Sequence, residues 1–128
     1  MADEGWEFGL GTIGVQRGEL AARREVYGRF LEGYIAGLQR LKRDREFTIA
    51  VAAEANKMDE RDLLEDYYAT YARYASAFPI TPPGAVQAPL DLLGTDLPAA
   101  RTAQRQAFID NSLLEELQAS GRLDGMTP

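Results

Sequence analysis

Hydrophobic side chains recur every three or four residues along most of the chain, which is the period of an α-helix with one buried face. The clearest stripe lies between Glu19 and about Asp44 and consists of Tyr27, Phe30, Leu31, Tyr34, Ile35, Leu38 and Leu41. Gly33 and Gly37 lie one turn apart in this helix, where a glycine costs about 1 kcal/mol relative to alanine. We therefore expect a neighbouring element to pack closely against these two glycines.

Two further helices are predicted between Asp44 and the first prolines. The first spans residues 47–56 and ends at Asn56 or Lys57. Asp59 is a good N-cap for the second, because its side chain can accept a hydrogen bond from the first turn. This helix reaches about Phe78, and its expected buried face consists of Leu63, Tyr67, Tyr71, Tyr74 and Phe78.

Proline and glycine divide the last third of the chain. Residues 80–84 (Ile-Thr-Pro-Pro-Gly) break the helical pattern, but Pro82 and Pro83 suit the first turn of a helix that runs through Val86, Leu90 and Leu93 to Gly94. Residues 95–100 are typical of a turn. A final helix is expected from Ser112, because Ser112-Leu-Leu-Glu115 matches a capping box, and Gly121 is a suitable C′ residue.

The first eighteen residues have a different pattern. Several glycines and the alternation of Leu10, Thr12, Ile13 and Val15 are typical of a short extended segment over residues 5–18. This is the best strand candidate in the chain. A single strand leaves its backbone donors and acceptors unpaired, so we expect it to pair with something outside the helical region.

Composition sets the size and excludes some partners. With 128 residues and 45% hydrophobic residues, the chain is long enough for one domain. Its net charge of −6 argues against nucleic acid, which proteins bind mainly through cationic contacts to phosphate. Seven of the fourteen basic residues lie between Arg23 and Arg45, but acidic residues are interleaved with them, so a solvated helix face is the preferred interpretation.

Residues with catalytic chemistry are scarce. Histidine and cysteine are absent, which removes the commonest general base and zinc–sulfur sites. The densest carboxylate group is Asp59, Glu60, Asp62, Glu65 and Asp66, whose helical spacing spreads the side chains instead of converging them on a metal. Tyr67, Tyr68, Tyr71 and Tyr74 could stack on a sugar or base, but core packing is the preferred explanation. We expect no enzymatic activity, no cofactor and no metal.

The order of these features resembles a known family, the substrate-binding proteins of ABC importers for nitrate, sulfonates, taurine and thiamine-precursor pyrimidines. Three stretches carry the resemblance. Residues 27–42 (Tyr-Gly-Arg-Phe-Leu-Glu-Gly-Tyr-Ile-Ala-Gly-Leu-Gln-Arg-Leu-Lys) are similar to the long helix after the second crossover of the family, and residues 59–79 to the helix that follows. The most specific match is residues 108–121, where Asp-Asn-Ser precedes a leucine-rich turn and a glycine.

The resemblance implies a mainly α fold of four to six helices and one short amino-terminal strand, corresponding to the carboxy-terminal part of lobe I of a periplasmic-binding-protein-like α/β fold. Residues 1–18 would be the hinge or crossover strand, and residues 19–128 the helical part of a single, partial domain. Family members bind a solute in a cleft between two lobes. By this resemblance Trp6, Gly11 and Thr12 are the candidate ligand-binding residues.

Partners and location also follow from the resemblance. The longer relatives bind a small solute and an ABC permease, and they are periplasmic or lipid-anchored outside the cell, whereas the first residues here lack the basic and apolar regions of a signal peptide. An unpaired strand is a template for association, so we also expect a homo-oligomer that uses Leu10 to Val15 and exposed helix faces. The alternative is a free-standing cytoplasmic helical module for protein interaction or oligomerisation.

Overall fold

A computed structural model describes residues 12–123 of the chain. This part contains seven α-helices and forms no β-strand, so the mainly α expectation is confirmed. The expected strand is wrong for residues 12–15, which have no regular secondary structure, while Leu10 lies outside the described residues. The helix count exceeds the expected four to six because two short helices, α1 (Arg17–Ala22) and α6 (Pro98–Arg101), were not anticipated.

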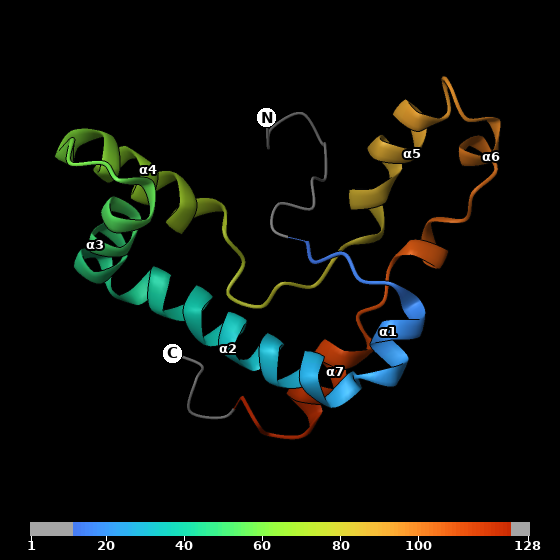
Figure 1. Cartoon of the computed structure of the whole chain (residues 1–128), viewed down its shortest axis with the longest axis horizontal. Helices are drawn as coiled ribbons and strands as arrows, with labels where there is room; N and C mark the ends of the chain where they lie inside the picture. Colours follow the sequence, from blue (N-terminus) through green and yellow to red (C-terminus); the bar gives the residue numbers. More distant parts are fainter. Residues whose placement is uncertain (1–11, 124–128) are drawn as a thin grey trace.

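The helices form an open, V-shaped arrangement (Figure 1). The longest helix, α2 (Arg24–Arg43), runs along the base, where α1 and α7 (Ser112–Ala119) lie beside its first turns. One arm consists of α3 (Arg45–Asn56) and α4 (Arg61–Tyr74), and the other of α5 (Gln87–Leu93) and α6. A long segment without regular structure crosses from the first arm to the second. Because the arms diverge, much apolar surface stays uncovered.

The main core lies where α7 packs on α2. Its buried residues are Ile35, Leu114, Leu117 and Leu123, and Leu31 and Phe78 pack against them. Ile35 is completely buried, at 0% exposure, which fits its place in the predicted stripe. This cluster is small for a chain of this length, and hydrophobic burial is the main favourable term in folding. The fold therefore depends strongly on the contact between α2 and α7.

The glycines of α2 differ from the expectation. An added Cβ at Gly33 or Gly37 would meet no heavy atom within 4 Å, so no neighbour packs closely there and that prediction is wrong. The close approach occurs instead at Gly28, which is buried and whose added Cβ would lie 3.8 Å from Leu113 Cδ1. The helical pattern identified the stripe but not the point along it where α7 crosses.

The first arm is a helical hairpin. Asp44 caps α3 by accepting a hydrogen bond from the Phe47 backbone N–H at 3.1 Å, and Lys57 ends α3 in the left-handed region with φ 51°. The N-cap of α4 is Glu60 instead of the expected Asp59, and α4 ends at Tyr74, four residues before Phe78.

The expected buried face of α4 is wrong. The buried residue is Leu64, whereas the stripe expected to be buried is 41–53% exposed in four of its members, Leu63, Tyr67, Tyr71 and Tyr74. The fifth, Phe78, is partly buried against the main core. The physical reason is that α4 packs mainly on one helix, α3, which covers only the side that carries Leu64.

Proline and glycine act as expected in the second arm. Pro83 begins a 3-10 turn, Pro83–Val86, which leads into α5, and Gly94 ends α5. The expected turn over residues 95–100 is partly replaced by α6. A second 3-10 turn, Arg105–Phe108, precedes α7.

The final helix begins at Ser112 as expected, but its cap differs. The N-cap residue is Asn111, and the Ser112 backbone N–H donates to the Asp110 carboxylate at 3.0 Å, so the capping box is not formed. Gly121 follows the helix with φ 70°, as expected for a C′ residue.

Candidate functional site

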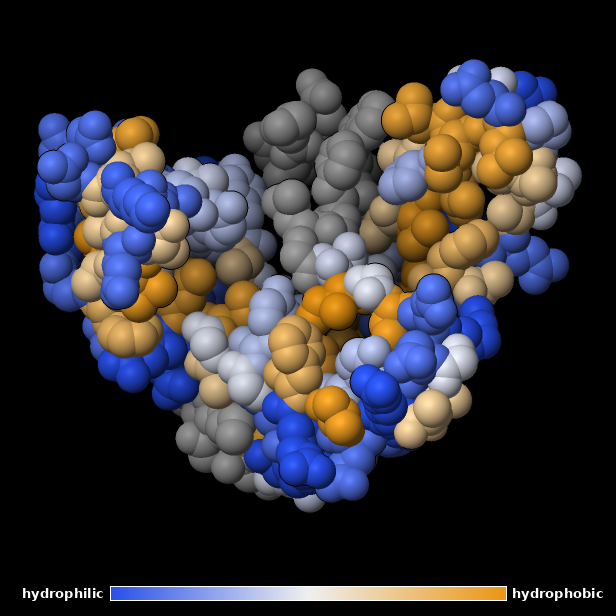
Figure 2. Space-filling view, in the orientation of Figure 1, coloured by the Kyte–Doolittle hydropathy of each residue, from blue (hydrophilic) through white to orange (hydrophobic). Residues whose placement is uncertain are grey.

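Two of the hollows on the described surface adjoin the contact between α2 and α7, one on each side of it. The first is an apolar groove of about 100 Å³ on the concave side. Its apolar residues are Ile13, Val15, Leu20, Tyr27, Phe30, Leu31, Tyr34, Pro79, Leu113 and Leu114, and its polar residues are Thr12, Thr81, Asp110 and Asn111. In Figure 2 hydrophobic residues gather in the middle of the concave side and over the second arm. The groove is smaller than the ~300 Å³ at which small-molecule pockets usually begin.

Asn111 fixes one end of this groove. Its side-chain nitrogen donates to the Thr81 carbonyl at 3.0 Å, and its side-chain oxygen accepts from the Thr81 backbone N–H at 3.1 Å. The amide thus pairs with the backbone of the crossing segment in the way a neighbouring strand would. This contact holds the segment from Pro79 onward against the start of α7.

Asp110 lies next to Asn111, just before α7, and its carboxylate is held by Ser112. Its carboxylate accepts hydrogen bonds from the Ser112 hydroxyl at 2.6 Å and the Ser112 backbone N–H at 3.0 Å. These hydrogen bonds, helped by the nearby positive charges of Arg24 and Arg17, lower the pKa of the Asp110 carboxyl. The Ser112 hydroxyl also accepts from Arg24 at 3.0 Å. The Ser112 hydroxyl therefore donates to the turn before α7 and accepts from Arg24 of α2, and the second of these contacts joins α7 to α2.

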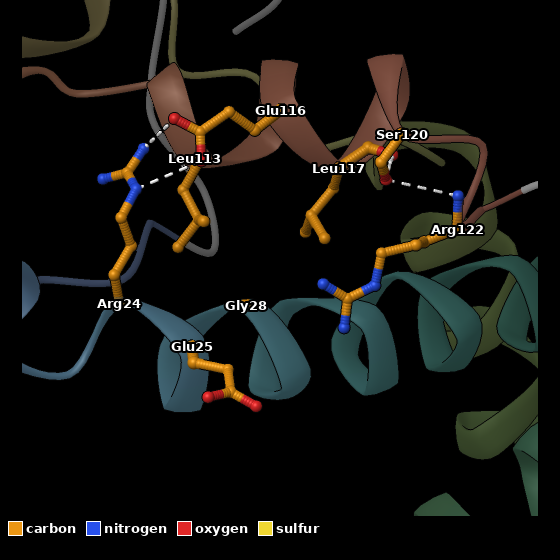
Figure 3. Close-up of a pocket in the computed structure, with 8 residues that line it drawn as sticks. All are labelled: Arg24, Glu25, Gly28, Leu113, Glu116, Leu117, Ser120 and Arg122. Carbon is orange, nitrogen blue, oxygen red and sulfur yellow. Dashed lines mark hydrogen bonds and ion pairs between the residues drawn. The ribbon is translucent and has the colours of Figure 1, made fainter.

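The second hollow has a volume of about 250 Å³ and opens on the other side of the same helix contact (Figure 3). It is lined by Arg24, Glu25, Gly28, Leu113, Glu116, Leu117, Ser120 and Arg122. In Figure 3 Arg24 reaches from α2 to Glu116 on α7, Leu113 and Leu117 point toward α2, and Glu25 points away.

Two arginines line this hollow and could bind an anion, but each of them pairs with an acidic side chain. Arg24 forms two hydrogen bonds with Glu116, at 3.1 and 2.5 Å, and the hydrogen bond to Glu116 is the main reason that the pKa of Arg24 is raised. Arg122 Nε lies 2.6 Å from Glu32 Oε1. Each guanidinium therefore ties α7 or the turn after it to α2, and the hollow has no unpaired positive charge to attract an anion.

Three basic residues of α2 and its preceding turn lie on a solvated helix face, as expected, whereas Arg24 contacts α7. Arg23 pairs with Glu19 at 3.5 Å, Arg29 with Glu25 at 2.8 Å, and Arg40 with Asp44 at 3.3 Å, all one helical turn apart. The three arginine side chains are exposed. Such pairs contribute a few tenths of a kcal/mol each.

A second group of charges joins the helices of the first arm. Arg61 binds Glu65 at 2.7 Å and Glu46 at 3.0 Å, and Arg45 contacts both of these carboxylates. The hydrogen bond from Arg61 is the main cause that lowers the pKa of Glu46. Within residues 12–123 no group of three or more His, Cys, Asp or Glu residues is arranged to hold a metal ion. The charges between α3 and α4 therefore serve to hold the hairpin together.

Only one predicted ligand-binding residue can be placed. Thr12 lies on the edge of the apolar groove and is exposed, whereas Trp6 and Gly11 lie outside the described residues. The helical period predicts a buried stripe that includes Tyr27, Phe30 and Tyr34, but these three residues line the apolar groove. A helical period identifies a face, but it does not tell whether the same chain covers that face.

No family model, no curated protein and no solved structure matches this chain. Within the described part, no helix is both long and apolar enough to cross a lipid bilayer.

Proposed function

We propose that this chain is the helical, carboxy-terminal part of lobe I of a solute-binding protein that serves an ABC importer. One observation carries the proposal. Two of the stretches that resemble the family, residues 27–42 and 108–121, are far apart in the sequence, yet their helices α2 and α7 form the main core together. If both stretches are inherited from one ancestral protein of this family, their helices should pack against each other.

The uncovered concave side supports the same proposal. Phe30, Ile13 and Val15 are 52%, 44% and 39% exposed although they line one apolar groove. An apolar patch of this kind usually marks an interaction surface. In a binding protein, the rest of lobe I would cover it.

The proposed role is binding without chemistry. The groove at Thr12 is too small to enclose a solute, so most ligand contacts would come from the rest of the protein. The candidate ligand-binding residues of the proposal are Trp6, Gly11 and Thr12, and the proposed solute is a sulfonate, nitrate or a pyrimidine. The permease would recognise the closed form.

The first test is the length of the native protein and its coding frame. We expect a product larger than 14.1 kDa, the mass of these 128 residues, with an export signal and a strand-rich segment before residue 1. Calorimetry on that protein with taurine, methanesulfonate, nitrate and a pyrimidine should give heat for one class at a 1:1 ratio. A native 14.1 kDa product without a strand-rich partner chain, or a long product that binds none of the four, would refute the proposal.

The longer protein also allows a test of Thr12. Replacing Thr12 with valine keeps the shape but removes the hydroxyl, so we expect about tenfold weaker solute binding, the equivalent of one hydrogen bond. Thr102→Val is the matched control, because Thr102 is exposed in the second arm and its hydroxyl bonds only the nearby Ala99 carbonyl. Equal affinities for the two variants would exclude Thr12 from the site.

A second function, a free-standing helical interaction module, is favoured by the exposed stripe on α4. Leu63, Tyr67, Tyr71 and Tyr74 present aromatic surface on an arm that stands away from the base (Figure 1). A native product of 14.1 kDa would support this function over transport.

A further inference from the structure

The exposed stripe of α4 has the form of a helix-pairing surface. Leu63, Tyr67, Tyr71 and Tyr74 follow at intervals of four, four and three residues, which places them within about 80° of arc on the helix. Tyr67 and Tyr71 stack on each other with ring centroids 4.4 Å apart. The pKa of Tyr67 is raised, first by its hydrogen bond with Tyr71. The stripe is thus an ordered apolar ridge about three turns long.

One flank of this ridge carries charges that have no ion-pair partner within residues 12–123. At 100° per residue, Asp62, Asp66 and Arg73 all lie to the same side of the stripe. No ion pair involves any of the three among the described residues, although nearby Arg61 and Glu65 are fully paired. Arg73 only contacts the Tyr74 ring, at 5.3 Å from its centroid.

We propose that a second copy of this chain docks on this stripe, with the two α4 helices antiparallel. The midpoint of the stripe lies between Tyr67 and Tyr71, so a two-fold axis there places Arg73 of one copy opposite the interval between Asp62 and Asp66 of the other. In an antiparallel helix pair, equal flanks face each other, so both Arg73 side chains meet two carboxylates. A parallel pair would put the charged flanks of the two copies on opposite sides of the seam, so Arg73 would face the other flank and meet neither Asp62 nor Asp66 of the partner. Charge therefore selects the antiparallel partner.

The size of the ridge sets the strength of the pairing. Four large side chains that are about half exposed offer roughly 400 Å² per copy, from about 150–250 Å² for a whole aromatic side chain. Stable interfaces bury about 800 Å² per partner. The pairing is therefore a weak one, with a dissociation constant in the micromolar range. It does not rest on the proposed transport function.

Sedimentation velocity of the 128-residue chain between about 1 and 200 μM tests the apolar part. We expect a monomer that becomes a dimer as concentration rises. Tyr71→Gln should shift the dissociation constant upward at least tenfold while the helical circular dichroism signal is kept. Phe108→Gln is the control, because Phe108 is 62% exposed in the 3-10 turn before α7, outside α4. A chain that stays monomeric, or a dimer that Tyr71→Gln leaves unchanged, would overturn the proposal.

Charge reversal tests the direction of the helices. Arg73→Asp alone, and Asp62→Arg with Asp66→Arg, should each weaken self-association at least tenfold. Mixing the two variants should restore a heterodimer, because each reversed flank then meets its complement. Arg105→Asp, the same change at an exposed site in the second arm, should leave the dimer intact. Failure of the mixed variants to associate more strongly than either alone would rule out antiparallel pairing through α4.

Discussion

Each apolar side chain contributes to the stability of the fold in proportion to how completely its neighbours bury it. Among residues 12–123, Ile35 is the one large side chain with less than 2% exposure, and it packs with Leu114 and Leu117 of α7. Most other large apolar residues remain partly accessible. The stability of the base therefore rests on a few positions.

Ile35→Ala should lower the free energy of unfolding by about 2–4 kcal/mol, because it leaves a cavity in a core that has few other residues to fill it. Urea denaturation at a fixed protein concentration measures this change. Val26→Ala is the control, since Val26 is 57% exposed on the same helix and should change stability by less than about 0.5 kcal/mol. Equal effects of both variants would show that α7 does not cover α2 at Ile35.

Asp110 makes the base sensitive to acid. The Ser112 hydrogen bonds, and then Arg24, hold the pKa of this carboxyl below its ordinary value of 3.8 in the folded chain. A lowered folded pKa contributes stability that is complete above the ordinary value and is lost as the pH falls through the folded pKa.

Asp110→Asn should therefore melt below the unmodified chain at pH 7, and the difference should shrink as the pH is lowered below about 4. Thermal unfolding followed by circular dichroism from pH 7 to about pH 2.5 measures both curves. The asparagine oxygen can still accept a hydrogen bond from the Ser112 N–H. The part of the difference in melting temperature that changes with pH therefore reflects the negative charge of Asp110. A difference that stays constant over this range would contradict the role of the Asp110 carboxylate.

At the scale of elements, α2 illustrates how a predicted helix can be right while its contacts are wrong. It ends near Asp44 as predicted, but it begins at Arg24 instead of near Glu19, and only Ile35 of the predicted stripe is fully buried. Gly33 and Gly37 face open space, and Gly28 is the glycine of α2 that meets α7. Helical period fixes which residues share a face. The position of α7 along that face depends on Leu113, which is 85 residues further along the chain than Gly28.

Gly33→Ala and Gly37→Ala should each raise the free energy of unfolding by about 0.5–1 kcal/mol, because alanine is the better helix former and nothing hinders its Cβ. Chemical denaturation measures the gain. Gly94→Ala serves as the contrast, since its Cβ would lie 2.9 Å from Arg101 Cγ and 3.2 Å from the Leu90 carbonyl oxygen, and it should destabilise the chain. Loss of stability at Gly33 or Gly37 would reveal a neighbour on that face.

At the scale of the whole molecule, the two arms and the base enclose little volume between them. Large apolar residues stay exposed on all three parts, among them Phe30 on α2, Tyr71 on α4 and Leu92 on α5. The hydrophobic content of the sequence is that of an ordinary globular domain. The exposed apolar surfaces of this open arrangement are therefore where the rest of lobe I, or a second copy of the chain, would bind.

The sequence by itself determined helices α2, α3, α4, α5 and α7, their main breaks and the absence of histidine and cysteine chemistry. These depend on residues close together: the period of the apolar positions, Pro83, Gly94 and Gly121. Only the tertiary structure decided that the α4 tyrosines are exposed, that Gly28 is the point of contact and that Asn111 pairs with Thr81. Each of these depends on which distant segment lies against a given face, and helical periodicity carries no information about that.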